Sequence, residues 1–421
     1  MPIRSRFQPS RATCALATLL ALAPWHANAA DTNAATLKPA VGLLANLYDN
    51  LRGGRRRGTT GMWNLYGSLR YHGAAGSQGP GFSAFAQVLN SGGGFPGDYT
   101  GDAQGVSNIA APHLTRLYEA WMQYNGRRSH WSVLLGRYDL NSEFDRLQTS
   151  ALFLDSSFGV EPAFSQSGGQ GPSIFPRPRF ALRVALKPSR NVVWRTAVLQ
   201  GGVPDDPGLP PGSQRTRGGD ALLVSELALL RRAPAAGADH EDWDGGMIGR
   251  LARQPPYTGK LALGLWHYAR REACLAPDAT AHACAASGAY LLLDDPALVR
   301  IGSAGRRLAG FAQLSVASPG ANRFRRYIGV GMSLSPLFDA SASDALGLAI
   351  ATVRNGRPYL RAQQAQGLPV ASTERIYELT YQRAVGAHLT LQPDLQYVVH
   401  PDTRADVANA LAFQFEVQLM Y

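Results

Sequence analysis

Hydrophobic and polar side chains alternate strictly along the last fifteen residues of the chain, 407–421. One set of alternate positions is large and apolar and includes Leu411, Phe413 and Phe415, whereas the other is small or polar and includes Gln414 and Glu416. Such alternation predicts a β-strand whose two faces meet different surroundings. The run exceeds the usual length of about 5–6 residues and is long enough to cross a bilayer, which takes about 9–11 tilted residues. An edge strand of a soluble β-sandwich alternates in the same way, so the other strands have to decide between the two.

The same alternation recurs in thirteen earlier segments, which makes about fourteen predicted strands. The segments are 63–71, 82–89, 114–124, 131–135, 180–186, 192–198, 222–230, 260–270, 307–316, 327–334, 345–352, 374–382 and 388–399. Charged side chains keep to one parity: in 114–124, Tyr118 and Met122 share the apolar parity and Glu119 has the other. A charge that faces lipid at mid-bilayer costs about 2–4 kcal/mol, whereas one that faces a wet lumen costs little. The pattern therefore predicts an all-β protein, a transmembrane antiparallel β-barrel with apolar side chains outside and polar ones inside.

The barrel prediction also sets expectations for its closure, its loops and its rims. Open sheet edges cannot lie in hydrocarbon, so the sheet has to close, with an even number of strands. No run of eighteen or more apolar residues occurs, which excludes membrane-spanning helices. The short connection 187–191 predicts a periplasmic turn, and 202–220, 272–288 and 357–372 predict external loops. Aromatic residues near strand ends are expected to form interfacial girdles: Trp63, Tyr71, Trp131, Tyr397 and Tyr421.

The amino-terminal segment predicts export and sets the domain boundaries. Three arginines precede a short apolar stretch, 14–24, and a small-x-small site at Ala27-Asn28-Ala29, which together are typical of a secretory signal peptide over 1–29. Residues 30–58 are expected to form an N-terminal periplasmic connector, which ends in an arginine-rich turn at 51–58. Residues 59–421 are expected to form the barrel domain.

Cysteine content and net charge limit the kinds of binding site and partner that we expect for this chain. Without the signal segment two cysteines remain, Cys274 and Cys284, and such a close pair in an exported protein predicts a disulfide. No histidine pair at ligand spacing supports a zinc site, and no cofactor or metal is expected. The formal net charge is +11, and subtracting the three arginines of the signal leaves +8. Because these cations are scattered through alternating strands without a recognition helix, no nucleic-acid partner is expected.

The densest polar cluster is 137–146, which follows a predicted strand and opens a connection of about forty residues. Connections of this length tend to be functional, and in a barrel this one could fold inward as a constriction loop whose carboxylates, amides and arginines face sugar hydroxyls. A solvated external loop without a ligand is the alternative. Glycosidase chemistry by Glu143 and Asp145 has only a weak signal, and no histidine lies in a recognisable hydrolase motif.

Charged residues of the polar parity are further candidates for the pore lining. Arg70 and Glu119 have this parity in their segments, as do Arg183 and Arg195 in two neighbouring ones. The last two could form part of a basic ladder that guides anions or binds sugar hydroxyls. They could equally pair with nearby carboxylates and hold the wall together.

Several motifs together resemble the carbohydrate-selective porins of the OprB type. They are Leu51-Arg52-Gly53-Gly54-Arg55-Arg56-Arg57-Gly58-Thr59, Gly136-Arg137-Tyr138-Asp139-Leu140-Asn141-Ser142-Glu143-Phe144-Asp145, Ser156-Ser157-Phe158-Gly159, Glu378-Leu379-Thr380-Tyr381-Gln382 and Leu391-Gln392-Pro393-Asp394-Leu395-Gln396-Tyr397. The resemblance implies a sixteen-stranded barrel in the outer membrane of a Gram-negative bacterium, surrounded by outer-membrane lipid. It also implies facilitated diffusion of monosaccharides and related small sugars, and a homotrimer.

The resemblance assigns lumen lining to the motif positions Arg137, Asp139, Asn141, Glu143 and Asp145. The Cys274–Cys284 loop has no counterpart that the resemblance supplies. Because arginines far outnumber lysines, a porin that prefers anions, phosphate or sugar acids is the alternative function.

Overall fold

The structure, a computed structural model, describes residues 35–73, 81–126, 130–202, 220–231, 257–276, 283–302, 305–338 and 343–421. The part from Ala35 to Tyr421 is one compact unit. The predicted signal peptide, 1–29, lies outside the described residues and stays a prediction. No helix among the described residues is long and apolar enough to cross a membrane.

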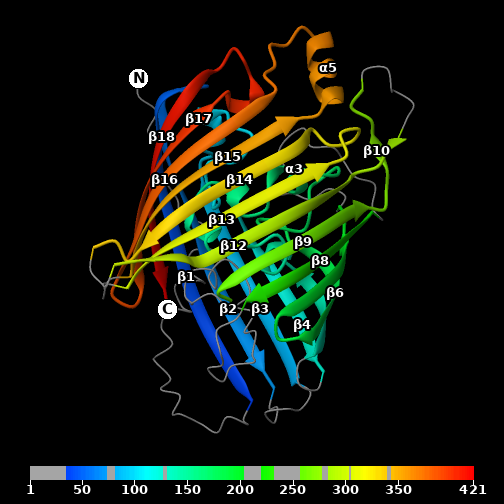
Figure 1. Cartoon of the computed structure of the whole chain (residues 1–421), viewed down its shortest axis with the longest axis vertical. Coiled ribbons are helices and arrows are strands. Elements are labelled where there is room, and N and C mark those ends of the chain that lie inside the picture. The colour runs from blue at the N-terminus through cyan, green and yellow to red at the C-terminus, as the bar shows by residue number, and fades with distance from the viewer. Residues whose placement is uncertain are drawn as a thin grey trace, which may run out of the picture. The chain divides into compact units, whose positions relative to one another are not determined.

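Sixteen antiparallel strands form one closed barrel (Figure 1). The strands are β1 (Thr36–Gly54), β2 (Gly58–His72), β3 (Gly81–Gly93), β4 (Leu114–Asn125), β5 (Trp131–Tyr138), β6 (Arg179–Ser189), β7 (Val192–Gln200), β8 (Ala221–Arg231), β9 (Gly259–Tyr268), β12 (Ser287–Ile301), β13 (Arg306–Ala317), β14 (Phe324–Ser335), β15 (Asp344–Asn355), β16 (Thr373–Val385), β17 (Leu389–Val399) and β18 (Ala408–Met420). Each strand pairs with its neighbours in the chain, apart from the step from β9 to β12, and β1 closes the sheet against β18. The predicted barrel and its sixteen strands are confirmed.

Strand β1 corrects the expected connector over 30–58, because it belongs to the barrel wall. It pairs with β2 from Thr36 to Asn50 and with β18 from Gly42 onward, so barrel closure depends on it. The alternation is blurred here, since Leu44 and Tyr48 lie on the inward parity and Pro39 interrupts the run. Both inward side chains are buried by material inside the barrel, which the local pattern does not show.

Strand β12 is the second strand that the alternation missed. The run Leu291-Leu292-Leu293 makes both faces of the strand apolar, because Leu292 points inward and is buried while Leu293 points outward and is exposed. After Asp295 the pairing with β13 shifts register up to Val299. An apolar run followed by such a bulge does not have the period of two that identifies a strand.

The two faces of the wall differ as predicted. Large apolar side chains such as Leu182, Leu263 and Leu348 point outward and are exposed, while Gln414, Glu416 and Gln418 of β18 point inward and are buried. The five expected girdle residues, Trp63, Tyr71, Trp131, Tyr397 and Tyr421, all stay exposed. This is the arrangement that a lipid-facing surface requires.

Two departures from simple parity occur in the wall. Tyr118, which was expected to face lipid, is fully buried, because a register shift between Gln87 and Val88 of β3 adds a residue to β4 and turns the tyrosine inward. The rule that charges keep to the inward parity also fails near strand ends at both rims, and Arg231 and Arg383 are examples at the end where Met420 lies. Arg326, Arg354 and Arg375 have the outward parity of their strands and are exposed.

Five long connections, those that follow β3, β5, β7, β9 and β15, leave the barrel at one end. Thr36 and Met420 lie at the other end, together with Arg231 and Gly259, which flank the one long connection on that side, 232–258. Outer-membrane barrels carry their longer loops on the external side, so we assign the long-loop end as extracellular. The two-residue turn between β6 and β7 falls at the opposite end, as expected for 187–191. Helix α5 (Arg357–Ala365) follows β15 at the extracellular end.

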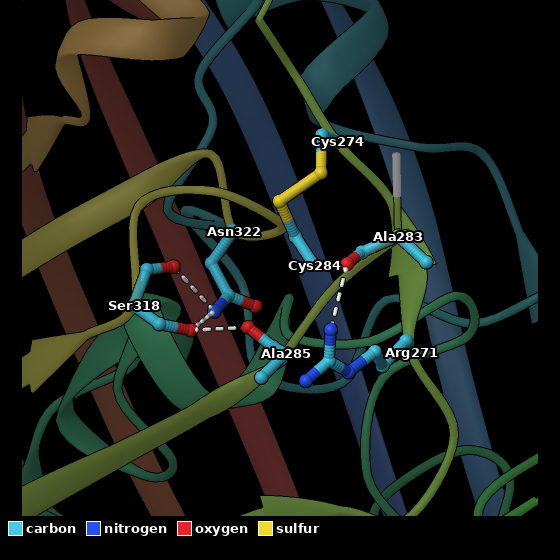
Figure 2. Close-up of a disulfide and its surroundings, with 7 residues drawn as sticks. All are labelled: Arg271, Cys274, Ala283, Cys284, Ala285, Ser318 and Asn322. Carbon is cyan, nitrogen blue, oxygen red and sulfur yellow. Dashed lines mark hydrogen bonds between the residues drawn. A yellow bond between two sulfur atoms is a disulfide. The ribbon is translucent and has the colours of Figure 1, made fainter. Parts of the chain in front are cut away.

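The connection after β9 carries a small sheet of its own, in which β10 (Glu272–Ala273) pairs with β11 (Ala283–Cys284) outside the barrel. The predicted disulfide joins Cys274, which directly follows β10, to Cys284 of β11 (Figure 2). Leu275 N donates to Gly320 O, and Ser318 Oγ donates to Ala285 O, so the hairpin is bound to the loop between β13 and β14.

The remaining elements are short and lie in the connections after β3, β5 and β17. They are α2 (Gly97–Thr100), the 3-10 turns η3 (Leu140–Ser142), η4 (Ser150–Leu152) and η5 (Ser156–Phe158), α3 (Pro162–Ser165) and η6 (Pro401–Thr403).

Candidate functional site

Residues 139–178, between β5 and β6, form a constriction loop that enters the barrel and crosses to the far wall. Tyr327 Oη of β14 donates to Ser157 O at 2.9 Å, and Gln313 Nε2 of β13 donates to Gly159 O at 3.3 Å. Helix α3 of this loop packs against β13 and β14, behind which it is visible in Figure 1. The inward-folded loop predicted from the polar cluster is therefore confirmed, and the alternative of a solvated external loop is wrong.

Carboxylates of the wall hold this loop by its main chain. Glu119 of β4 accepts from Asp139 N at 3.0 Å, and Glu226 of β8 accepts from Asp145 N at 3.0 Å. Asp294 of β12 accepts from Gln148 N at 2.7 Å and from Thr149 N at 3.2 Å. Hydrogen bonds to ionised acceptors are about twice as strong as neutral ones, so these contacts hold the loop at spaced points.

Further anchors lie on β9 and β16. Lys260 Nζ donates to Arg146 O at 2.9 Å and pairs with Glu226 at 3.1 Å. The two carboxylate oxygens of Glu378 accept from Leu154 N at 2.6 Å and from Asp155 N at 3.1 Å. The loop is thus attached to strands on opposite sides of the barrel, which keeps it across the lumen.

A second inward segment, residues 94–113 between β3 and β4, was not identified from the sequence. Glu374 of β16 accepts from Ala103 N and Gln104 N, and Val106 O accepts from Gln396 Nε2 at 3.0 Å. The length of this connection, about twenty residues between two predicted strands, is the one signal that the sequence offered.

Three of the motif residues assigned to the pore lining maintain the loop's own structure. Asp139 accepts from Tyr118 Oη and from Asn141 N, and it is almost completely buried. Asn141 Nδ2 donates to Phe144 O and Asp145 O. Asp145, at a positive φ of 48°, accepts from Glu161 N.

Glu143 joins the loop to two arginines of the wall. Arg183 Nε lies 2.8 Å from one of its oxygens, Arg195 Nε lies 3.4 Å from the other, and Tyr138 Oη donates to it at 2.7 Å. Arg183 also donates to Ser132 Oγ and to Gln123 Oε1. Of the two alternatives for Arg183 and Arg195, pairing with a carboxylate that holds the structure together is the one observed.

The remaining predicted residues differ in where they face. Glu119 is inward and fully buried. Arg70 has the inward parity of β2, and its guanidinium lies 5.3 Å from the centroid of the Phe85 ring. Arg137 is a correction, because it has the parity of Trp131 and Leu135, whose side chains face outward. The motif spacing alone could not show that strand β5 continues through position 137 and imposes this parity.

A cavity of about 300 Å³ lies between the two inward segments and the wall formed by β1, β17 and β18. Asn108, Asn141 and Phe175 line it from the loops, and Glu416 and Gln418 line it from β18. Both of these β18 side chains are buried, and Gln418 Nε2 donates to Glu416 Oε1 at 2.8 Å. Carboxylate and amide oxygens accept hydrogen bonds, so this polar lining is suited to a molecule that carries several O–H donors.

Two carboxyl groups of the constriction loop are buried away from compensating cations. Burial raises the pKa of Asp155 to about 8, although hydrogen bonds from Ser157 N and Ser157 Oγ oppose the shift. Burial likewise raises the pKa of Glu161 to about 7. Both groups therefore exchange protons near neutral pH.

The weak glycosidase signal finds no support in this geometry. Glu143 is bound to two arginines, and Asp145 is fully buried and bonded to the loop main chain. A pair of catalytic carboxyls has to flank a substrate bond from an open cleft. In the described residues no group of three or more His, Cys, Asp or Glu side chains is placed to hold a metal ion.

Comparison with known families decides the membership of this chain. Residues 73–420 match the carbohydrate-selective porins of the OprB family. The chain belongs to this family. Family and fold are those of a porin channel, and they place this OprB-family chain in the outer membrane of a Gram-negative bacterium as a multi-pass barrel.

A curated relative, Porin B of Pseudomonas aeruginosa, is 31% identical over 133 residues, which are 28% of this chain and 29% of that protein. The alignment thus spans less than a third of the relative's length. The high-pH structure of Pseudomonas putida OprB superposes with a TM-score of 0.73 at 17% identity, over 91% of this chain and 94% of that one. The channel DcaP of Acinetobacter baumannii gives 0.55 at 10% identity, over 93% and 99% of the two chains. At such identities the structural likeness shows the fold alone.

Proposed function

We propose that this OprB-family chain is a passive outer-membrane channel for the facilitated diffusion of monosaccharides and related small sugars. The observation that supports the proposal best is the cavity beside the constriction loop. Its polar lining, which includes Asn141, Glu416 and Gln418, matches the hydroxyl groups of a sugar, and the Phe175 ring can lie against the apolar face of a pyranose. A volume of about 300 Å³ equals the space of about ten waters, which is of the order that a monosaccharide needs.

The same geometry favours neutral sugars over anions at this point of the lumen. Acceptor oxygens on β18 repel an anion, and Arg183 and Arg195 are already engaged by Glu143. A porin that prefers anions, phosphate or sugar acids is the alternative function, supported by the surplus of arginine in the sequence.

Planar-bilayer recordings with the purified protein test the proposal. Added glucose should block the single-channel current in a concentration-dependent way. Replacing both Glu416 and Gln418 by leucine removes acceptors worth about 0.5–1.5 kcal/mol each, so the sugar concentration for half block should rise about tenfold. Gln87→Leu is the matched control, because Gln87 is an inward, buried glutamine of β3 that does not line the cavity.

Normal conductance without any sugar block would reject the sugar preference. Reversal potentials in a salt gradient separate the alternative, since strong anion selectivity that sugars do not affect would favour an anion porin.

A further inference from the structure

Three arginines on neighbouring strands break the inward rule for charged residues at the extracellular rim. Arg326 of β14 stands directly opposite Arg354 of β15, and Arg375 of β16 stands opposite Thr352, two residues from Arg354. All three have the outward parity of their strands and are exposed. Strands β14, β15 and β16 run side by side in Figure 1 and lead up to α5.

No carboxylate in the described residues offsets this cluster with an ion pair. Glu374, next to Arg375, points inward and is occupied by the main chain of residues 103 and 104. Asp402 is paired with Arg323 at 2.8 Å and with Arg55 at 3.6 Å. Two further exposed arginines, Arg357 and Arg361, follow on α5.

Like charges directly opposite each other on adjacent strands destabilise a sheet. The outward face of a barrel has a simple alternative, since an aliphatic or aromatic side chain at the same place would face lipid at no cost. An external anion that binds Arg326 and Arg354 together removes the repulsion. Guanidinium groups fit phosphate oxygens in bidentate geometry, so phosphate is the chemistry that this cluster matches.

The surface below the arginines identifies the source of the phosphate. Toward the barrel centre, Ile328 and Val330 of β14 and Leu348 and Ile350 of β15 form an exposed aliphatic surface. Beside it lie the outward rings of Tyr377 and Tyr397, whose centroids are 6.5 Å apart. A cationic layer above an aliphatic one complements a molecule that carries both a phosphate head and acyl chains, which free phosphate does not.

We propose that Arg326, Arg354 and Arg375 form a binding site for the phosphates of the glycolipid in the outer leaflet, with its acyl chains on the aliphatic surface of β14 and β15. The site is separate from the lumen, so it does not depend on the proposed sugar transport. Bound lipid neutralises the opposed arginines and secures the rim of the barrel in its leaflet.

The test measures binding of lipid A with its phosphates to the detergent-solubilised protein by native mass spectrometry. A cation near an anionic lipid surface contributes about a fivefold gain in affinity, so R326Q/R354Q/R375Q should bind about a hundredfold more weakly. The wild type should bind the enzymatically dephosphorylated lipid about as weakly as the triple variant binds the phosphorylated one. Inorganic phosphate at the same concentration should not compete.

Arg383→Gln is the matched control. Arg383 is an exposed, outward residue of the same strand, β16, but it lies at the opposite end of the barrel. Its lipid affinity should equal that of the wild type, and all variants should keep the wild-type conductance and sugar block. The variant R326K/R354K/R375K, which keeps the three positive charges, should bind the phosphorylated lipid more tightly than the glutamine variant and more weakly than the wild type. Three results would each overturn the proposal. The wild type and the glutamine triple variant could bind phosphorylated lipid equally, or the wild type could bind dephosphorylated lipid as tightly as phosphorylated lipid. The third is effective competition by inorganic phosphate.

Discussion

Glu143 shows how much of the pore geometry depends on one side chain. It receives Arg183 from β6, Arg195 from β7 and the Tyr138 hydroxyl from β5, and its side chain is only 7% exposed. Breaking a buried ion pair by removing one partner costs about 3–5 kcal/mol, because the remaining charges stay buried without compensation. The arginines that the sequence suggested for an anion ladder therefore depend on this carboxylate.

Glu143→Gln should consequently lower the thermal stability of the channel and raise its preference for anions, since two guanidinium groups lose their counter-charge. The midpoint of unfolding and the reversal potential in a salt gradient measure the two effects. Arg195→Gln is the control, because it leaves the shorter Arg183–Glu143 pair in place and should lower anion preference with little loss of stability. An unchanged reversal potential in Glu143→Gln would show that these arginines do not face the ion path.

Asp155 makes the constriction loop sensitive to pH. Its pKa in the folded protein is about 8, well above the usual value of about 3.9, because the group is buried. The folded state holds a proton that the unfolded state releases, so the stabilisation is complete below about pH 4 and is lost as pH rises through about 8.

Between about pH 4 and about pH 8 the amides around residue 155 should therefore lose protection against hydrogen exchange beyond the intrinsic effect of pH. Asp155→Asn, which cannot ionise, should flatten this dependence. The control Asp98→Asn changes an exposed carboxyl of the other inward segment and should keep the wild-type profile. A profile in Asp155→Asn identical to that of the wild type would assign the pH dependence to another group.

At the scale of elements, the two inward segments are attached to the wall chiefly through their main chains. Carboxylates of β4, β8, β12 and β16 accept from loop N–H groups, and the side chains of Gln392 and Gln396 on β17 donate to loop carbonyls. Asp294 is the simplest of these anchors to test, because the next residue, Asp295, is a carboxylate of the same strand that does not hold the loop. Asp295 points to the other side of β12 and pairs with Arg231, with 26% of its side chain exposed.

Asp294→Asn should release the part of the loop around residues 148 and 149, since one amide oxygen replaces a charged acceptor of two N–H groups and the Tyr257 hydroxyl. Hydrogen bonds to charged groups contribute about 1.5–3 kcal/mol, so exchange of these amides should accelerate about tenfold or more. Single-channel conductance should rise as the constriction widens. Asp295→Asn should change neither quantity, and equal effects of both substitutions would mean that the anchor is not specific.

At the scale of the whole molecule, the barrel exists because β1 closes it. Without Thr36–Gly54, strands β2 and β18 would both present open edges to hydrocarbon, where unsatisfied N–H and C=O groups are very costly. The β10–β11 hairpin and its disulfide lie outside this closed sheet, so their contribution is local.

Deletion of residues 36–54 should therefore abolish the compact, heat-modifiable form of the barrel on gels. The double variant Cys274→Ser/Cys284→Ser, in contrast, should keep that form and lose protection against proteolysis only around the hairpin. A folded barrel from the deletion variant would contradict the closure that the structure shows.

The fold was predictable because lipid and water impose opposite preferences on alternate residues. This holds where both surroundings are present, as along β18, and it fails where the inward face meets the protein's own loops. Leu44 and Tyr48 in β1 and Leu292 in β12 are apolar on the lumen side for this reason, and those two strands were the ones missed. The disulfide was predictable from the spacing of two cysteines in an exported chain.

The site was less predictable, because the role of a polar residue depends on its partner across the barrel. The sequence indicated that the segment 137–146 enters the lumen, but it could not show that Glu143 meets two wall arginines. Nor could it show that Arg137 still follows the outward parity of β5. The acceptors on β18 were visible as alternate polar positions, yet only the folded loops show that Glu416 and Gln418 border a cavity.

Attachment through the main chain has a consequence for how such channels diversify. Glu119, Glu226, Asp294 and Glu378 bind amide groups that every residue type except proline provides. Mutations can therefore exchange side chains such as that of Gln148 without removing the main-chain support. Grafting such a stretch from one channel into another is a practical route to a new permeation profile on an unchanged scaffold.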